Sequence, residues 1–169
     1  LTNFFLSCAG SDQVDTDWIN AASSAIAHLK SLKMMDIDLS FTHYIHDSLA
    51  DFTKTVLNGQ SKIENLALRM EMIEMDDNDA TDLGEALLSG TSLISLVGDR
   101  GVNEIGDGGH LTAVGAGSLV TSLRQLPQLT HLTLGFVQNI DLGKDGAMAI
   151  AVALNSGFTS LKSLYLDLE

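Results

Sequence analysis

The segment LKSLYLDL, residues 161–168, decides the fold that the sequence predicts. Its leucines stand at the first, fourth, sixth and eighth positions, and the last three alternate like the buried face of a β-strand. The same apolar pattern begins at residues 1, 32, 63, 93 and 129, so neighbouring copies start 31, 31, 30, 36 and 32 residues apart. The pattern therefore indicates that the chain consists of repeated copies of one structural unit.

Helical patterns fill the intervals between the predicted strands. Apolar residues recur there at helical spacing, as in Ile19/Ala22/Ile26/Leu29, Leu49/Phe52/Val56 and Ala147/Ile150/Ala151/Leu154, and more weakly over 83–88 and 116–126. Acidic or hydroxyl residues are placed to cap the helix starts: Asp15 or Thr16, Asp47, Asp79 or Thr81, and Asp145. Glycines follow the helix ends at 59, 90 and 157. Because every strand returns in the same direction, the sequence predicts a parallel sheet whose stacked units share one core.

These segments resemble a leucine-rich repeat protein over the whole chain. The helical stretch DGAMAIAVAL (145–154), followed by TSLKSLYL (159–166), is most similar to the ribonuclease-inhibitor-like subclass. The resemblance implies an α/β solenoid, or horseshoe, with about six strands on its concave side and helices on its convex side. Two departures stand out: the repeats are longer than is usual in that subclass, and the usual Asn ladder after the strand is missing.

The repeats predict a single leucine-rich-repeat domain over residues 1–169, with copies starting near 1, 32, 63, 93, 129 and 161. The chain begins and ends on a strand pattern without a polar cap, so we expect a fragment of a longer chain or ends covered by other chains. The opening stretch LTNFFLSCAG could be taken for the end of an export signal. Its match to the repeat instead predicts a first strand with Cys8 facing the core. The apolar eighth positions predict strands extended by one inward residue.

Composition narrows the classes of function. The chain has 22 acidic against 9 basic residues and a formal net charge of −13, which disfavours binding to nucleic acids and anionic membranes and favours a basic protein partner. No apolar run approaches the roughly 18 residues that a membrane helix needs. The single cysteine excludes an internal disulfide and favours a reducing compartment, so we predict a cytoplasmic protein.

An acidic segment at 74–85 has some of the spacing of a calcium-binding loop. Glu74, Asp76 and Asn78 would be the first ligands and Glu85 the twelfth, but Asp79 stands where such a loop needs glycine. A helix-capping acidic loop is therefore the favoured interpretation, with cation binding left open.

Other possible sites are weaker. His43 and His46 are three residues apart in a loop, without a third ligand for a metal. The glycine-rich stretch 97–110 has no phosphate-loop spacing and is interpreted as an inserted loop, which accounts for the 36-residue step. Since no catalytic constellation is recognisable, the sequence predicts a protein that is not an enzyme and has no cofactor, and it assigns no residue as a metal ligand.

The third, fifth and seventh repeat positions face outward and align along a parallel sheet. The candidate partner-binding residues on this concave face are Phe5, Asp36, Asp38, Arg69, Asp99, His131, Thr133, Tyr165 and Asp167. We expect a non-catalytic protein–protein interaction scaffold that could be part of a larger complex. Two alternatives stay open: an enzyme regulator (an inhibitor of a basic enzyme or a GTPase activator, roles implied by the resemblance) and a structural subunit of a large assembly.

Overall fold

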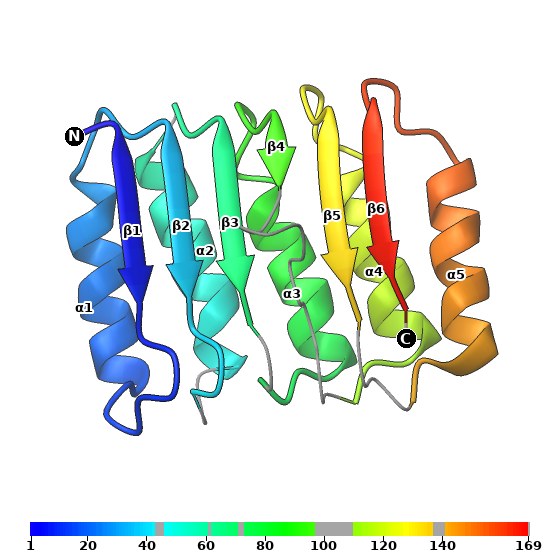
Figure 1. Cartoon of the computed structure of the whole chain (residues 1–169), viewed down its shortest axis with the longest axis horizontal. Helices are drawn as coiled ribbons and strands as arrows, with labels where there is room; N and C mark the ends of the chain where they lie inside the picture. The colour runs from blue at the N-terminus through cyan, green and yellow to red at the C-terminus, as the bar shows by residue number, and fades with distance from the viewer. Residues whose placement is uncertain (43–45, 61, 71–72, 97–109, 137–140, 169) are drawn as a thin grey trace.

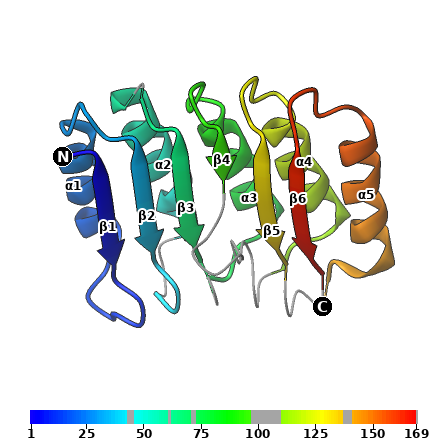
Figure 2. The same cartoon turned by 45° about the horizontal axis from the view of Figure 1, so that its top comes forward.

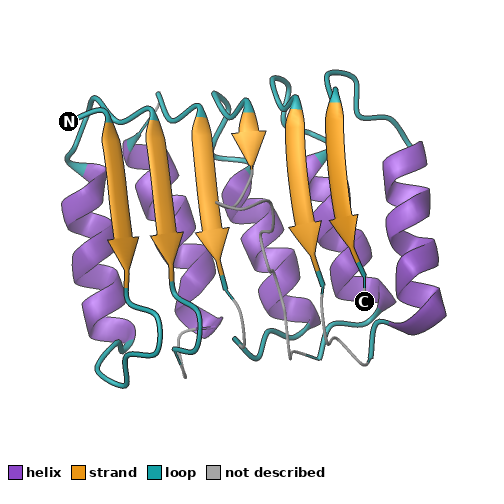
Figure 3. Cartoon of the chain, viewed as in Figure 1, coloured by secondary structure: helices purple, strands orange, loops and turns teal. Residues whose placement is uncertain are grey.

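The computed structural model describes residues 1–42, 46–60, 62–70, 73–96, 110–136 and 141–168. Strands and helices alternate along the chain (Figures 1 and 3). The elements are β1 (Asn3–Ser7), α1 (Thr16–Ala27), β2 (Met34–Asp38), α2 (His46–Gly59), β3 (Asn65–Arg69), α3 (Asp77–Leu87), β4 (Ser95–Leu96), α4 (Ala113–Leu123), β5 (His131–Gly135), α5 (Gly143–Asn155) and β6 (Ser163–Asp167).

The strands form one sheet in the order β1-β2-β3-β4-β5-β6, and every neighbouring pair is parallel. The helices all lie on one side of this sheet, as the two views in Figures 1 and 2 agree. Each helix carries the chain back to the start of the next strand, which is why neighbours in sequence are neighbours in the sheet. The predicted α/β leucine-rich-repeat solenoid is confirmed.

The strand register pairs residues at equal repeat positions. Third positions align across all six strands, in the order Asn3, Met34, Asn65, Ser95, His131 and Ser163. Fifth and seventh positions align in the same way between β1, β2 and β3 and between β5 and β6. The repeat spacing read from the sequence therefore becomes rows of side chains that run across the sheet.

The core lies between the sheet and the helices and is built from the fourth, sixth and eighth repeat positions. In the repeat that contains β3 these positions are Leu66, Leu68 and Met70, which are at most 1% exposed. The eighth residue also extends the ladder, because the backbone N–H of Leu39 donates to Arg69 O at 2.9 Å. The predicted inward eighth residue is thus confirmed in the middle of the sheet, while Leu168 of the last copy is 41% exposed.

Helix α1 begins where the sequence predicted. Asp15 is its N-cap, and its carboxylate accepts from the backbone N–H of Trp18 at 2.8 Å. At the other end of the chain, Gly157 follows α5 with φ 106°, the left-handed conformation expected of a glycine after a helix.

Three predicted N-caps are wrong. Helix α2 already includes Asp47, and α5 includes Asp145 in its first turn, after Leu142 at the N-cap with no side-chain cap. In α3 the N-cap is Asp76 rather than Asp79 or Thr81. The carboxylate of Asp79 instead accepts from the Asp76 backbone N–H at 2.9 Å, and Asp76 accepts from Asp79 in return. This reciprocal capping box fixes the start of α3.

The acidic segment after β3 is thus confirmed as a helix-capping segment. In the described part of the chain, no group of three His, Cys, Asp or Glu side chains is placed to hold a metal ion. His43 and nearly all of the glycine-rich stretch 97–110 lie outside the described residues. The interpretations of the histidine pair and of the inserted loop therefore stay predictions. Across the described residues, no helix is long and apolar enough to cross a membrane.

One carboxylate ties the third and fourth helical units together. Asp77, in the first turn of α3, accepts from the backbone N–H groups of Thr112 at 2.8 Å and Gly115 at 2.9 Å through Oδ1. Its Oδ2 accepts from the Thr112 hydroxyl at 2.6 Å. Thr112 is the N-cap of α4, so the start of α4 is satisfied partly by its own residue and partly by the preceding unit. Sequence analysis missed this contact, which spans 35 and 38 residues.

Candidate partner-binding face

The side of the sheet opposite the helices carries the third, fifth and seventh repeat positions, and we call it the open face. No helix covers it among the described elements (Figures 1 and 2). Eight of the nine predicted site residues belong to strands at these positions: Phe5, Asp36, Asp38, Arg69, His131, Thr133, Tyr165 and Asp167. Asp99, the ninth, lies outside the described residues.

Exposure divides these side chains into three groups. Phe5 and Tyr165 are 63% and 51% exposed, and His131 is also exposed. Asp38, Arg69 and Asp167 are half-buried. Asp36 and Thr133 are buried, at 7% and 5%. The open face therefore presents two aromatic rings near its two edges, while one of its predicted acidic groups is hidden.

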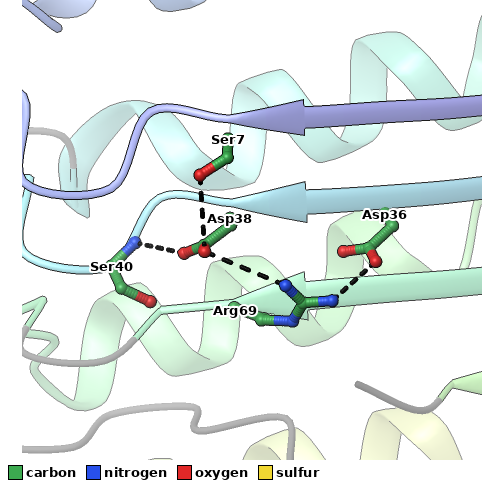
Figure 4. Close-up of polar contacts among 5 residues, drawn as sticks. All are labelled: Ser7, Asp36, Asp38, Ser40 and Arg69. Atoms are coloured by element: carbon green, nitrogen blue, oxygen red, sulfur yellow. Dashed lines mark hydrogen bonds and ion pairs between the residues drawn. The ribbon is translucent and has the colours of Figure 1, made fainter. Parts of the chain in front are cut away.

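The buried Asp36 pairs with Arg69, a cation from the next strand. Nη2 of Arg69 lies 2.6 Å from Asp36 Oδ2, an ion pair across the β2–β3 step. Nη1 of the same guanidinium is 3.8 Å from Asp38 Oδ2, a much looser pairing (Figure 4). The three groups carry two negative charges and one positive charge. Of the two carboxylates, Asp36 is the one that Arg69 pairs with closely, and Asp38 is the more exposed.

Asp38 is held in place from its other sides. Its Oδ1 accepts from the Ser40 backbone N–H at 3.1 Å, and its Oδ2 accepts from the Ser7 hydroxyl at 3.5 Å (Figure 4). These contacts fix the carboxylate against β1 and the end of β2. Its side chain is still 20% exposed.

A small hollow opens beside this cluster. It has a volume of about 150 Å³ and is lined by Phe5, Leu6, Ser7, Asp36, Asp38 and Arg69. The lining combines an exposed aromatic ring with a charged group. Sequence reasoning named four of these residues from their repeat positions, but it had no means of seeing that they surround one hollow.

The other edge of the open face has a different chemistry. Thr133 pairs with Tyr165 and Gly135 pairs with Asp167 in the β5–β6 register. His131 lies beside them, and its Nδ1 is 2.7 Å from the Thr130 hydroxyl.

Two titratable groups near the strand ends have shifted pKa values. Burial raises the pKa of the Cys8 thiol, and the nearby charge of Asp38 raises it further. The pKa of His110 is also raised, because its Nδ1 lies 2.9 Å from Asp141 Oδ2 in a hydrogen-bonded pair. A half-buried thiol of raised pKa is a poor nucleophile, which agrees with the inward position predicted for Cys8.

A second, more polar hollow of about 350 Å³ lies on the helix side, between α2 and α3. Its lining residues are Ala50, Asp51, Lys54, Asp82, Glu85 and Ala86. Glu85, the predicted twelfth ligand of a calcium loop, therefore lies on the surface of α3 facing α2. It takes no part in the capping of α3 by Asp76 and Asp79.

Comparison with known proteins supports the fold and leaves the function open. No family model matches the chain, and no curated protein matches it in sequence. Among solved structures it is similar to the tropomodulin C-terminal domain from Caenorhabditis elegans, with a TM-score of 0.55 and 15% sequence identity. The similarity covers 89% of this chain and 83% of that chain. At this identity the comparison concerns the fold alone, and it supports a leucine-rich-repeat-like class for this chain.

Proposed function

We propose that the chain is a non-catalytic protein-binding scaffold whose open face receives the partner. The observation that carries the proposal is a sheet face on which side chains stand in aligned rows and which no described helix covers. Among the residues that the structure describes, the two most exposed aromatic side chains, Phe5 and Tyr165, both belong to it.

The physical chemistry of interfaces supports this choice of face. Exposed aromatic rings bury a large apolar area at little entropic cost and often anchor an interface, while charges around them guide the encounter. With a net charge of −13, the chain attracts a basic partner more readily than an acidic one. We therefore assign the anchoring contacts to Phe5 and Tyr165, and the guiding role to the half-buried Asp38 and Asp167.

The same proposal includes two expectations about the cell. The chain catalyses no reaction of its own, and it works in the cytoplasm, where its single cysteine stays reduced. Fractionation of cells that produce the tagged chain checks the second expectation: recovery with the cytosol supports it, and recovery with secreted material contradicts it.

The test uses two double variants that remove equally exposed apolar side chains from opposite sides of the molecule. Phe5→Ser with Tyr165→Ser changes the open face, and Val114→Ser with Met148→Ser changes α4 and α5, where the side chains are 66% and 61% exposed. Partners captured by the immobilised native chain are identified by mass spectrometry and measured again with each variant. We expect the open-face variant to lose the partner and the helix-side variant to retain it. Equal retention by both variants contradicts the proposal.

A further inference from the structure

We propose that the hollow between β1, β2 and β3 receives a single lysine side chain of the partner protein. This inference rests on the proposed function and names the chemistry of one contact on the open face. It is carried by the juxtaposition of an exposed ring, Phe5, with a partly exposed acidic side chain, Asp38, in one hollow.

The size of the hollow selects a side chain rather than a small molecule. Its volume is about 150 Å³. Sites for small molecules usually measure about 300–1,000 Å³. A hollow of the smaller size accommodates one extended side chain while the rest of the partner lies on the surrounding sheet.

The charge of the lining selects a cation. Asp36 and Asp38 against Arg69 leave one net negative charge in the lining. Arg69 lies 2.6 Å from Asp36 and 3.8 Å from Asp38, so of these two carboxylates it pairs more closely with the buried Asp36. The Asp38 side chain is 20% exposed against 9% for Asp36, so Asp38 is the more accessible of the two carboxylates. An anionic side chain would face the same carboxylate at close range.

The contacts already made by Asp38 select lysine over arginine. One oxygen accepts from the Ser40 backbone N–H and the other from the Ser7 hydroxyl, so each oxygen already has one acceptor site in use and fewer directions remain for a two-point contact. An arginine guanidinium binds best as a planar, two-point donor, whereas a lysine ammonium is a compact point charge. The lysine stem would lie along the exposed ring of Phe5, as amphipathic side chains commonly lie on apolar surface.

The test measures binding of short peptide probes by NMR of the backbone amides. The probes are acetyl-Gly-Lys-Gly-amide, its arginine counterpart and its norleucine counterpart, which keeps the stem and lacks the charge. We expect saturable shifts at the Ser7, Asp38 and Ser40 amides with the lysine probe, weaker binding of the arginine probe, and no saturation with norleucine. A set of small shifts spread over all acidic surface residues would overturn the proposal, as would stronger binding of the arginine probe.

Variants of the hollow and a control variant elsewhere on the surface test whether the lysine probe binds in the hollow. Asp38→Asn and Phe5→Leu should each weaken binding of the lysine probe by about two- to fivefold, the range for an exposed ion pair or cation–π contact. Asp17→Asn, which removes the same charge from the exposed surface of α1, should leave it unchanged. Amide spectra of the free variants confirm that each is folded. If Asp38→Asn binds the probe as well as the native chain does, the inference is wrong.

The outcomes separate this inference from the proposed function. If the open-face variant loses its partner but the lysine probe does not bind in the hollow, the scaffold function is supported and the lysine contact is wrong. If the probe binds but partner capture does not depend on the open face, the proposed function falls. Partner capture tested with Asp38→Asn then shows whether the native partner uses this contact.

Discussion

Replacing Asp77 by alanine is expected to lower the free energy of unfolding by about 3 kcal/mol. The substitution removes one carboxylate that accepts three hydrogen bonds, from Thr112 N, Gly115 N and the Thr112 hydroxyl. Two of these donors are backbone N–H groups at the start of α4, and a helix start has no internal partners for its first N–H groups. The variant therefore leaves donors unsatisfied at the contact between two units.

The expected loss of unfolding free energy follows from the number of hydrogen bonds to Asp77 and from how far this carboxylate is buried. A hydrogen bond to a charged group contributes about 1.5–3 kcal/mol, and loss of a helix cap costs about 1 kcal/mol. Three bonds that share one half-buried carboxylate are not additive, and water reaches part of the site, so a total near the upper value for one bond is expected. With a urea dependence of about 2 kcal/mol per M, the unfolding midpoint should fall by about 1.5 M.

The assay combines urea unfolding with amide hydrogen exchange. Unfolding gives the global loss, and exchange shows whether the Thr112 and Gly115 amides lose their protection, as the assigned contacts require. Asp82→Ala is the control, because Asp82 is an exposed residue of the same helix and its loss should change stability by less than about 0.5 kcal/mol. If the two variants unfold at the same urea concentration, the reasoning about Asp77 is refuted.

Gly115→Ala tests the contact between Asp77 and the start of α4 from the α4 side. A Cβ atom on Gly115 would lie 2.5 Å from Asp77 Oδ1 and 2.7 Å from Asp77 Cα. Alanine favours a helix over glycine by about 1 kcal/mol, yet Gly115→Ala should destabilise the chain because this contact must open. On the same helix, Gly117→Ala meets nothing closer than Ala149 Cβ at 3.3 Å and should change stability far less.

Three further results are expected. Arg69→Met should cost about 3 kcal/mol of stability in urea unfolding, because it removes the close ion pair that Arg69 makes with the buried Asp36 carboxylate, and adding Asp36→Asn should restore part of that loss. The Cys8 thiol, whose pKa is raised by burial, should react with iodoacetamide at pH 7 more slowly than free cysteine, and an equal rate would contradict its placement. Because pairing with Asp141 raises the pKa of His110 above 6.5, this pair should stabilise the fold below about pH 6.5 and lose its effect as pH rises through the raised value. An NMR titration in which Asp141→Asn leaves the His110 pKa unchanged would exclude that pairing.

The strands and their register were predictable because repetition fixes them. A side chain at position five of one copy has to stand beside position five of the next when the strands are parallel and the steps are equal. The apolar eighth positions likewise predicted an extended ladder, which Leu39 and Phe136 show by donating to the following strand. Repeat spacing thus located the open face and most of its residues without any knowledge of contacts.

The helix starts and the burial of individual polar groups were not predictable in this way. Several acidic residues stand near each helix start, and only the local backbone decides which one caps, as the choice of Asp76 over Asp79 shows. The burial of Asp36 depends on the reach of an arginine one strand away, a property of two side chains rather than of a pattern. The bonds from Asp77 to the start of α4 join residues 35 and 38 apart across an inserted loop, where spacing carries no information.

The equal spacing of the first three copies also determines the length of segment that could be deleted or inserted without disturbing the repeat. Copies begin at residues 1, 32 and 63, and the contacts Ser7–Asp38 and Lys33–Glu64 each join residues 31 apart. Removing residues 32–62 would join the end of the first helical unit directly to the third strand pattern without changing any repeat position. Phe5 would then stand beside Ala67 and Ser7 beside Arg69, in place of Asp36 and Asp38. One whole repeat can therefore be gained or lost without changing the repeat positions, and each such change replaces the residues that one strand contributes to the open face.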